Sequence, residues 1–199
     1  KLPMLGEHNV QNCLAALSIC IEMGISEAAI RKGLEQFKGV GRRFDFKGMV
    51  NGITVIDDYG HHPVEIKASL SAGRMRCPDG KLIAVVQPHR YTRLRDLFED
   101  FCACFNDADD VLVADVYAAG EAPIDGVEKT DLVVGLHAYG HRNAAVLSSP
   151  EALADEILAR AVSGDLVMCL GAGTITNWAG TLPNELALKT GHPVEGDGA

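Results

Sequence analysis

The sequence predicts an α/β fold in which helices cover both faces of a mostly parallel β-sheet, preceded by a short helical segment. From residue 44 onward, apolar runs of strand length alternate with segments of helical periodicity. The interiors of the runs at 81–87 and 166–170 are continuously apolar, which is typical of strands buried on both faces of a parallel sheet. The first 43 residues contain two helical patterns and no strand pattern.

Residues 8–23 form the first predicted helix, and Gly24 is suited to end it. Ser26 is placed to cap a second helix that runs to about residue 37, with Ile25 and Ile30 positioned as a hydrophobic staple. Two helices cannot bury their apolar faces alone, so this unit needs a partner, either later in the chain or in a longer polypeptide. Apolar side chains recur at helical spacing in the first helix at Val10, Cys13, Leu14, Leu17 and Ile21.

A linker at 39–45 separates these helices from the part that forms the sheet. Strands at 44–50 and 53–57 are joined by Asn51-Gly52, a strong signal for a hairpin, so the first strand adds one antiparallel edge. The polar, Gly-rich tail from Lys189 is predicted to be loose. Further helices are predicted at 63–75, 92–105, 130–139, 150–162 (with Ser149 as its cap) and 176–188, and further strands at 81–87, 111–115, 144–147 and 166–170.

The composition excludes some classes of function. A formal net charge of −9 argues against a general nucleic-acid binder, which is normally basic. The longest strongly apolar run, 166–172, is far too short to cross a bilayer, and the start of the chain has no signal-peptide pattern, so no membrane partner is expected. The six cysteines lack zinc-ligand spacing and indicate reduced, mostly buried thiols of a cytoplasmic protein, with a redox role for Cys102 and Cys104 as an alternative.

Polar side chains gather where the predicted strands end, and ligands of parallel sheets bind at the carboxyl ends of strands. The segment Asp57-Asp58-Tyr59-Gly60-His61-His62-Pro63 places two acids, a phenol and two histidines in one strand-to-helix turn. It favours a binding site in which Asp58 accepts hydrogen bonds from a ligand hydroxyl and Tyr59 and His61 face a substrate. Helix capping remains an alternative; a metal site is disfavoured because this segment lacks histidines at i, i+4 spacing, and no metal ligands are assigned.

The segment Gln87-Pro88-His89-Arg90-Tyr91-Thr92-Arg93 indicates an anion site. It puts His89, Arg90 and Arg93 around the start of a predicted helix, where free backbone N–H groups and a guanidinium fork suit a carboxylate or phosphate. The alternative is that the arginines pair with acids on a solvated helix face, namely Asp96, Glu99 and Asp100.

The glycines at 171 and 173 form only a weak dinucleotide signal, because Thr176 stands where a third glycine is needed. This loop is better explained by a close approach of the backbone to a ligand or to neighbouring loops. Neither a phosphate-loop sequence nor a G-x-S-x-G nucleophile turn occurs in the chain.

Taken together, the motifs resemble those of the Mur ligase family, the ATP-dependent amide ligases that build the peptidoglycan stem peptide, from about Leu5 to Leu188. Within that family they are most similar to the members that join L-alanine to UDP-N-acetylmuramate. The segments that carry the resemblance are Gly6-Glu-His8-Asn9-Val-Gln-Asn12-Cys-Leu-Ala-Ala16, Gly41-Arg42-Arg43-Phe44, Asp57–Pro63, Gln87–Arg93 and Gly171-Ala-Gly-Thr-Ile-Thr-Asn-Trp178.

The resemblance implies that residues 1–43 are the last helices of a central ATP-binding domain and that residues 44–199 are a Rossmann-like C-terminal domain that binds the incoming amino acid. It implies ATP with Mg²⁺ as cofactor, with the phosphate loop, the metal ligands and the missing N-terminal domains lying upstream. ATP would convert the carboxylate of UDP-N-acetylmuramate into an acyl phosphate that the amine of L-alanine attacks. The fragment alone is expected to be inactive, because domain closure is needed.

Roles follow for individual residues from the same resemblance. His8, Asn9 and Asn12 would contact adenine, Arg43 would reach the phosphate or ribose of ATP, and Asp58 the ribose hydroxyls; a polar helix face is the alternative for the first three. The L-alanine pocket would comprise Tyr59, His61, His89, Arg90 and Arg93, and His61 or His89 would act catalytically on the proton of the incoming ammonium.

Three other functions stay open. A ligase that attaches a preformed tripeptide to the same UDP-sugar acid would share the Asp57–Pro63 pattern, although its next loop differs. A nucleotide-binding module without catalysis is compatible with the missing phosphate loop. A nicotinamide enzyme rests only on the glycines of the 171–174 loop.

Overall fold

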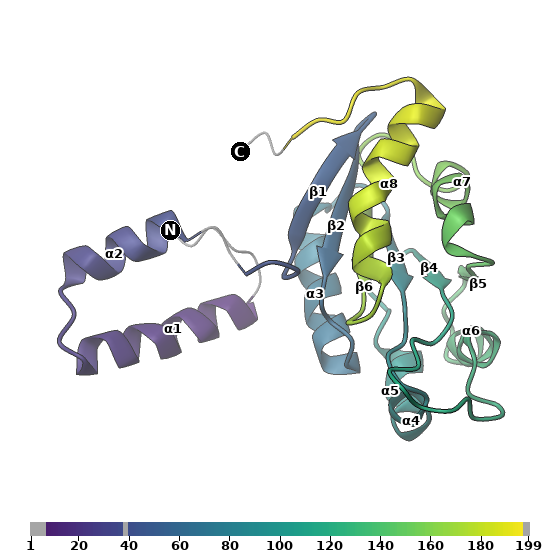
Figure 1. The fold of residues 1–199 in the computed structure, drawn as a ribbon, viewed down its shortest axis with the longest axis horizontal. Helices are drawn as coiled ribbons and strands as arrows, with labels where there is room; N and C mark the ends of the chain where they lie inside the picture. Colours follow the sequence, from purple (N-terminus) through teal and green to yellow (C-terminus); the bar gives the residue numbers. More distant parts are fainter. Residues whose placement is uncertain (1–6, 38–39, 197–199) are drawn as a thin grey trace.

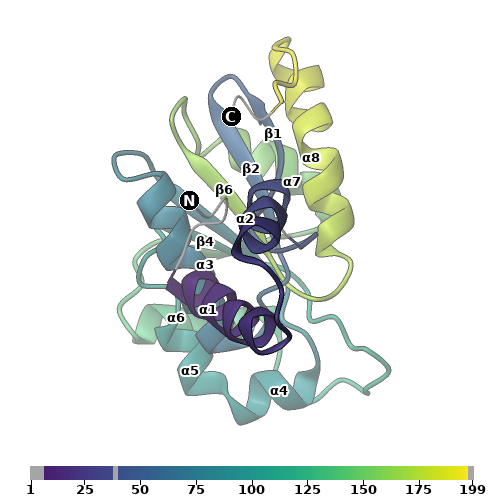
Figure 2. The same cartoon turned by 90° about the vertical axis from the view of Figure 1, so that its left-hand side faces the viewer.

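The computed structural model describes residues 7–37 and 40–196, with side chains from residue 9 onward (Figure 1). Helices α1 (Glu7–Glu22) and α2 (Glu27–Gln36) lie to one side of the rest of the chain, as Figures 1 and 2 show from two directions. Ser26 caps α2 as predicted, its side chain accepting a hydrogen bond from the backbone N–H of Ala29.

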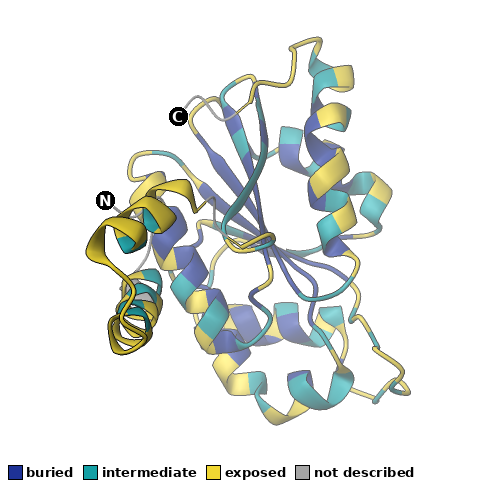
Figure 3. Cartoon of the chain, turned by 60° about the vertical axis from the view of Figure 1, so that its left-hand side comes forward, coloured by how far each residue is buried: buried dark blue, intermediate teal, exposed yellow. Residues whose placement is uncertain are grey.

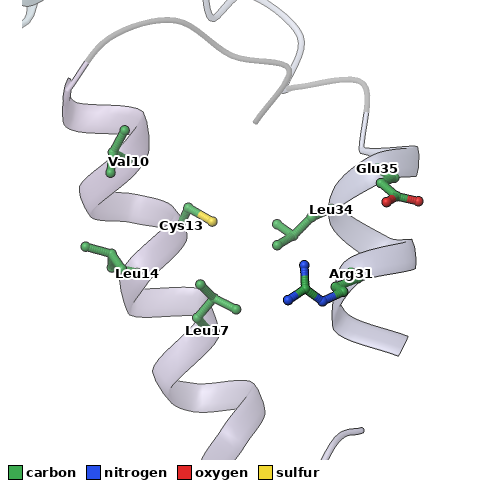
Figure 4. A pocket seen from close by; sticks show the side chains of 7 residues that line it. All are labelled: Val10, Cys13, Leu14, Leu17, Arg31, Leu34 and Glu35. Atoms are coloured by element: carbon green, nitrogen blue, oxygen red, sulfur yellow. The ribbon is translucent and has the colours of Figure 1, made fainter. Parts of the chain in front are cut away.

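The apolar faces of α1 and α2 are not buried within the described chain. No residue of α2 is buried, and Leu14, Ile19 and Ile21 of α1 are 57%, 60% and 66% exposed. A cavity of about 260 Å³ separates the two helices, and Figure 4 shows Cys13 and Leu17 pointing into it from α1 and Leu34 from α2. Within the described residues the two helices do not bury their apolar faces alone, as predicted, and a partner that covers them stays a prediction.

The rest of the chain is built on one six-stranded sheet of order β1-β2-β6-β3-β4-β5. Strand β1 is antiparallel to β2, and all other neighbours are parallel. Asn51 and Gly52 both have positive φ, at 50° and 75°, which is the conformation of the predicted hairpin turn. The strands are β1 (Asp45–Val50), β2 (Ile53–Asp58), β3 (Leu82–Val86), β4 (Asp110–Val113), β5 (Ala144–Val146) and β6 (Leu166–Leu170).

Helices cover both faces of this sheet, as predicted. One core contains side chains of α3 (Pro63–Arg76), α4 (Tyr91–Asp96), α5 (Phe98–Ala103) and α6 (Lys129–Ala138). The opposite core contains side chains of α7 (Leu153–Leu158) and α8 (Ile175–Thr190). Strands β3 and β6 are buried at every residue, whereas the N-terminal helices are largely exposed (Figure 3).

The structure corrects several predicted boundaries. The helix predicted at 92–105 is two helices, because the backbone leaves the helical conformation at Leu97, with φ −118° and ψ 25°. The helix predicted at 150–162 is a 3₁₀ turn, Pro150–Ala152, followed by the shorter α7, and the Ser149 side chain makes no cap hydrogen bond. Strand β4 ends at Val113, so Asp115 lies in the following loop.

The tail is less loose than predicted. Helix α8 continues to Thr190, and Glu195 then pairs with Met49 through two backbone hydrogen bonds of 2.8 and 3.0 Å. Since β1 is an edge strand, the tail covers part of an open edge of the sheet.

The cysteines within the described residues are all unpaired, and Cys77, Cys102, Cys104 and Cys169 are buried. Burial raises the pKa of the thiols of Cys102 and Cys104, which argues against the redox alternative for this pair. Among the residues that the structure describes, no helix is both long enough and apolar enough to cross a membrane.

Candidate active site at the carboxyl edge of the sheet

Four aromatic rings form a row beyond the carboxyl ends of β2, β3 and β4. The rings of Tyr59 and His61 meet edge to face with centroids 5.1 Å apart, and His61 lies 5.6 Å from His89. The ring of His89 stacks on Tyr117 at 5.3 Å. Three predicted site residues, from motifs about 30 positions apart, are therefore brought together, and a fourth ring that was not predicted as a site residue joins them.

The Tyr117 segment holds the His89 loop through its backbone. The N–H of Arg90 donates to the carbonyl of Tyr117 at 2.8 Å, and the N–H of Tyr117 donates to the carbonyl of Pro88 at 2.8 Å. Arg90 has φ 72° and ψ 132°, a conformation that non-glycine residues rarely adopt. Strained backbone of this kind persists where its surroundings fix it, and it is common at binding sites.

Gly173 lies directly against the Tyr117 side chain. A Cβ atom at Gly173 would come within 2.6 Å of Tyr117 Cγ and 2.5 Å of Gln87 Oε1. The Gln87 side chain in turn accepts a hydrogen bond from the N–H of Ile175 at 3.1 Å. The glycine loop after β6 thus allows close contact with neighbouring loops, one of the two explanations that the sequence favoured.

The arginines after β3 have different partners. Arg93 Nη1 donates to the carbonyl of His89 at 2.9 Å and lies 3.2 Å from His89 Nδ1. Arg95 pairs with Asp96 on the helix surface, as the solvated-face alternative predicted. Arg90 Nη1 lies 3.8 Å from a carboxylate oxygen of Glu121.

Glu121 occupies the helix start where an anion was predicted to bind. The backbone N–H of Thr92 donates to Glu121 Oε2 at 3.0 Å, and the Thr92 hydroxyl donates to Oε1 at 2.6 Å. These two hydrogen bonds lower the pKa of Glu121, and the bond from the Thr92 hydroxyl contributes the larger part. The chain therefore supplies its own anion, the Glu121 carboxylate, at the N-terminus of α4, and Arg90 lies within ion-pair distance of it.

The two histidines of the β2–α3 turn serve different purposes. His62 is the N-cap of α3, its Nδ1 accepting a hydrogen bond from the N–H of Val64 at 3.3 Å, so the capping alternative holds for this residue. His61 is not a cap; its side chain is 18% exposed and faces His89. Glu65 accepts hydrogen bonds from the N–H groups of both His61 and His62.

The two aspartates at the end of β2 are buried and bonded within the chain. Asp58 accepts hydrogen bonds of 2.8 Å from the N–H of Phe44, the N–H of Gly60 and the Ser69 hydroxyl. Asp57 accepts one of 2.6 Å from the hydroxyl of Thr176. Asp58 therefore fixes the end of the linker to the sheet, a structural role that the sequence did not predict.

The two linker arginines both lie near the Tyr59 ring but have different surroundings. Arg42, at φ 60°, donates from Nη2 to the carbonyl of Gly171 at 2.6 Å and lies 4.8 Å from the centroid of the Tyr59 ring. Arg43 is exposed, and its guanidinium lies 5.5 Å from the same ring. A cavity of about 180 Å³ between α1 and the sheet domain has Asn9, Arg43, Asp58, Glu65 and Ser69 as its polar lining.

Three predicted nucleotide contacts, Asn9, Arg43 and Asp58, thus share one cavity. Asn12 is exposed on α1 and does not line it, and the side chain of His8 lies outside the described part of the structure. Sequence reasoning gave no role to Arg42, Glu65, Tyr117 or Glu121. Arg42 nevertheless lies in the segment 41–44 that carries the family resemblance, and Tyr117 follows the predicted strand at 111–115, at the edge where ligands were expected. Glu65 had one sequence signal, its position three residues after the cap His62, which is the spacing of a capping box.

Charge and burial set the protonation of two groups in the site. Burial, followed by the charges of Arg93, His61 and Arg90, lowers the pKa of His89. Burial acts to raise the pKa of Glu65, but the backbone bond from His61, the charge of His61 and the bond from His62 lower it overall. Around neutral pH, His89 is therefore neutral and Glu65 is a carboxylate. Within the described residues, no three His, Cys, Asp or Glu side chains are placed to hold a metal ion.

The sheet and the motifs at its carboxyl edge are those of a known family. Residues 42–173, more than half of the chain, match the sequence profile of the Mur ligase, glutamate ligase domain. The chain therefore belongs to the Mur ligase family.

The most similar relatives share one name. A UDP-N-acetylmuramate–L-alanine ligase of Phenylobacterium zucineum is 63% identical over 93% of this chain and 39% of its own length. One of Caulobacter vibrioides is 58% identical over 96% of this chain and 40% of its own length. The crystal structure of a UDP-N-acetylmuramate–alanine ligase of Thermotoga maritima superposes with a TM-score of 0.78 at 27% identity, covering 94% of this chain and 40% of that one. The chain thus spans about 40% of the length of the relatives it matches.

Proposed function

We propose that this chain is part of an ATP-dependent ligase that joins L-alanine to UDP-N-acetylmuramate through an acyl phosphate, in the cytoplasm. The observation that carries the proposal is the convergence of Tyr59, His61 and His89 in one row of rings, with Arg93 beside it. The names of the relatives support the choice of substrates.

The amino-acid pocket we propose consists of Tyr59, His61, His89, Arg90 and Arg93. A guanidinium has five N–H donors, so the bonds from Arg93 Nη1 to His89 leave others for the carboxylate of L-alanine. Arg90 is exposed at the same loop and adds a second positive charge. The rings of Tyr59, His61 and His89 are suited to enclose a small apolar side chain next to that carboxylate.

The nucleotide site we propose comprises Asn9, Arg43 and Asp58, with His8 and Asn12 on the same helix. The donor set of the cavity fits a nucleotide, because an amide suits the adenine edge and a guanidinium suits phosphate or ribose oxygens. Asp58 already accepts three hydrogen bonds within the chain. We propose that the remaining lone pair of its carboxylate accepts a hydrogen bond from a ribose hydroxyl. When bound, ATP with Mg²⁺ supplies the phosphoryl group that turns a carboxylate into an electrophile.

We further propose that residues 1–43 complete a central ATP-binding domain and residues 44–199 form the domain that binds the amino acid. The exposed apolar faces of α1 and α2 support this, because they have no partner within the described residues. The phosphate loop and metal ligands would belong to the upstream part, consistent with the 39–40% of the relatives' length that the chain spans. Closing the two domains would gather the reacting groups and exclude water from the acyl phosphate.

The decisive experiment is ADP release by the full-length polypeptide with UDP-N-acetylmuramate, comparing L-alanine with the tripeptide L-alanyl-γ-D-glutamyl-diaminopimelate. Release that depends on L-alanine is the expected result. Release with the tripeptide alone would move the function to the tripeptide ligase, and no release with either would leave a nucleotide-binding module. The isolated chain serves as the control and is expected to make no amide.

A further inference from the structure

His61 and His89 are neighbours in the row of rings, yet their Nδ1 atoms face groups of opposite kind. Nδ1 of His61 lies 3.0 Å from the carbonyl oxygen of Tyr59 and 3.4 Å from Oε2 of Glu65. A carbonyl and a carboxylate can only accept hydrogen bonds. Nδ1 of His61 must therefore carry a proton, and in the neutral ring the lone pair is on Nε2.

Glu65 is held in the position that this arrangement needs. Its carboxylate accepts hydrogen bonds from the backbone N–H groups of His61 at 3.1 Å and His62 at 3.3 Å. The net lowering of its pKa, in which those bonds outweigh burial, keeps it ionised at neutral pH. A carboxylate behind a histidine fixes the ring orientation and stabilises the imidazolium when the ring takes up a proton.

Nδ1 of His89 faces the opposite kind of group. It lies 3.2 Å from Nη1 of Arg93, and a guanidinium can only donate. Nδ1 of His89 must therefore be the acceptor, and the proton of the neutral ring is on Nε2. The other charged groups around this ring are His61, Arg90 and Glu121, and burial together with the arginines and His61 lowers its pKa.

We infer that the two histidines are locked in opposite tautomers with different tasks: His61 accepts the proton of the incoming ammonium, while His89 donates a hydrogen bond from Nε2–H. Glu65 is the positioning residue of His61, and Arg93 is that of His89. The assignment of tasks rests on the proposed function, whereas the assignment of tautomers rests on the contacts alone.

The proton balance of the step is simple. One N–H bond of the ammonium group breaks, and its proton binds the lone pair at His61 Nε2. The amine keeps the electron pair and becomes the nucleophile, while the positive charge moves to the imidazolium beside Glu65. His89 cannot take this role, because protonating its Nδ1 would place two donors against each other at Arg93.

The tautomers can be measured directly. In the chain labelled with ¹⁵N-histidine, protonated and unprotonated ring nitrogens have well-separated shifts, and spectra of His61→Gln and His89→Gln assign the two signals. We expect a protonated Nδ1 in His61 and a protonated Nε2 in His89 at neutral pH. The same tautomer in both rings, or the reverse arrangement, would overturn the inference whatever reaction the enzyme catalyses.

The tasks can be separated by kinetics in the full-length enzyme. His61→Gln is expected to lower kcat with L-alanine by about 10²-fold or more at pH 7. The ratio of its rate to that of the wild type should rise by up to about tenfold per pH unit above pH 7, because free amine replaces the missing proton acceptor. The ratio for His89→Gln should stay constant with pH, and His137→Gln, a change at an exposed position of α6, should match the wild type.

A pH-dependent rescue of His89→Gln and not of His61→Gln would overturn the assignment of tasks. Glu65→Gln should retain part of the His61 function, since an amide oxygen still accepts from Nδ1, and should lower kcat with little change in KM for L-alanine. If L-alanine is not a substrate of the wild-type enzyme, the proposed function fails, and the NMR result still decides the tautomers.

Discussion

Arg42 donates a 2.6 Å hydrogen bond to the carbonyl of Gly171, 129 residues further along the chain. The same guanidinium lies 3.6 Å from the buried carboxylate of Asp57 and over the ring of Tyr59. One side chain of the linker thus connects the ends of β2 and β6 and one end of the ring row. Arg43, the next residue, is exposed and lines the proposed nucleotide cavity instead.

Arg42→Ala is expected to lower the free energy of unfolding by about 1–3 kcal/mol, because a hydrogen bond is lost and Asp57 keeps fewer partners in a buried place. Urea denaturation of the chain measures this. Arg43→Ala is the matched control, and its unfolding free energy should stay within about 0.5 kcal/mol of the wild type. Equal effects of the two changes would contradict an anchoring role for Arg42.

Gly173→Ala is expected to displace the Tyr117 ring, since the added Cβ would lie 2.6 Å from Tyr117 Cγ. Because Tyr117 stacks on His89, the full-length enzyme should show a KM for L-alanine raised by roughly tenfold, equivalent to about 1.4 kcal/mol, with little change in KM for ATP. Gly180→Ala, where nothing lies within 4 Å of the added atom, is the control. An unchanged KM for L-alanine in Gly173→Ala would mean that the stacking of Tyr117 on His89 does not support the pocket.

Arg93→Ala is expected to raise the KM for L-alanine by about 10- to 100-fold, because a charge-assisted hydrogen bond to the carboxylate, which contributes about 1.5–3 kcal/mol, is lost. The KM for ATP should change by less than about threefold. Steady-state kinetics of the full-length enzyme test this, with Arg95→Ala as control because Arg95 pairs with Asp96 on the surface. A larger effect on ATP would place Arg93 on the nucleotide side.

Asp109 provides a pH-dependent contribution to stability away from the site. Burial acts to raise its pKa, but the bond from the N–H of Leu82 and the contact with Arg74 lower it overall. A lowered pKa stabilises the folded chain above the unfolded value, near pH 4 for Asp, and this stabilisation is lost as pH falls through the folded value.

Asp109→Asn should therefore lower the unfolding free energy at pH 7 by about 1 kcal/mol, a modest figure because the side chain is 45% exposed. The difference from the wild type should shrink below about pH 4. Chemical denaturation at several pH values measures both effects, with the exposed Asp79→Asn as control. A difference that persists at pH 2–3 would point to packing rather than charge.

The fold was largely predictable because the central strands β3 and β6 are continuously apolar and the strands are bounded by polar turns. The strand at 166–170 has the predicted limits, and Asn51-Gly52 makes the predicted hairpin turn. The break at Leu97 was not predictable, since the helical periodicity of the sequence continues through it. The pairing of the tail with β1 was also missed, because a single backbone bridge leaves no pattern in side-chain identity.

The site was predictable where its residues form compact motifs and not where they act through distant contacts. His61 and His89 belong to loops that follow β2 and β3, which lie on either side of β6, and the carboxyl ends of parallel strands meet at one edge. Tyr117 was expected at this edge because it follows the predicted strand at 111–115, but its backbone bonds to the His89 loop were not predictable. Glu121 joins the site through bonds to Thr92, about 30 residues away, which spacing cannot reveal. The opposite surroundings of the two histidine rings likewise exist only in three dimensions.

The bridge between Glu195 and Met49 has a practical consequence for handling the protein. An uncovered edge strand exposes a row of N–H and C=O groups that can recruit the same strand of another molecule into a growing aggregate. At the opposite edge, β5 is only three residues long, which limits this hazard. A chain that ends before residue 194 would lose the pairing of Glu195 with Met49 and leave this part of β1 exposed. Such C-terminal truncations should therefore precipitate more readily than chains that keep the tail.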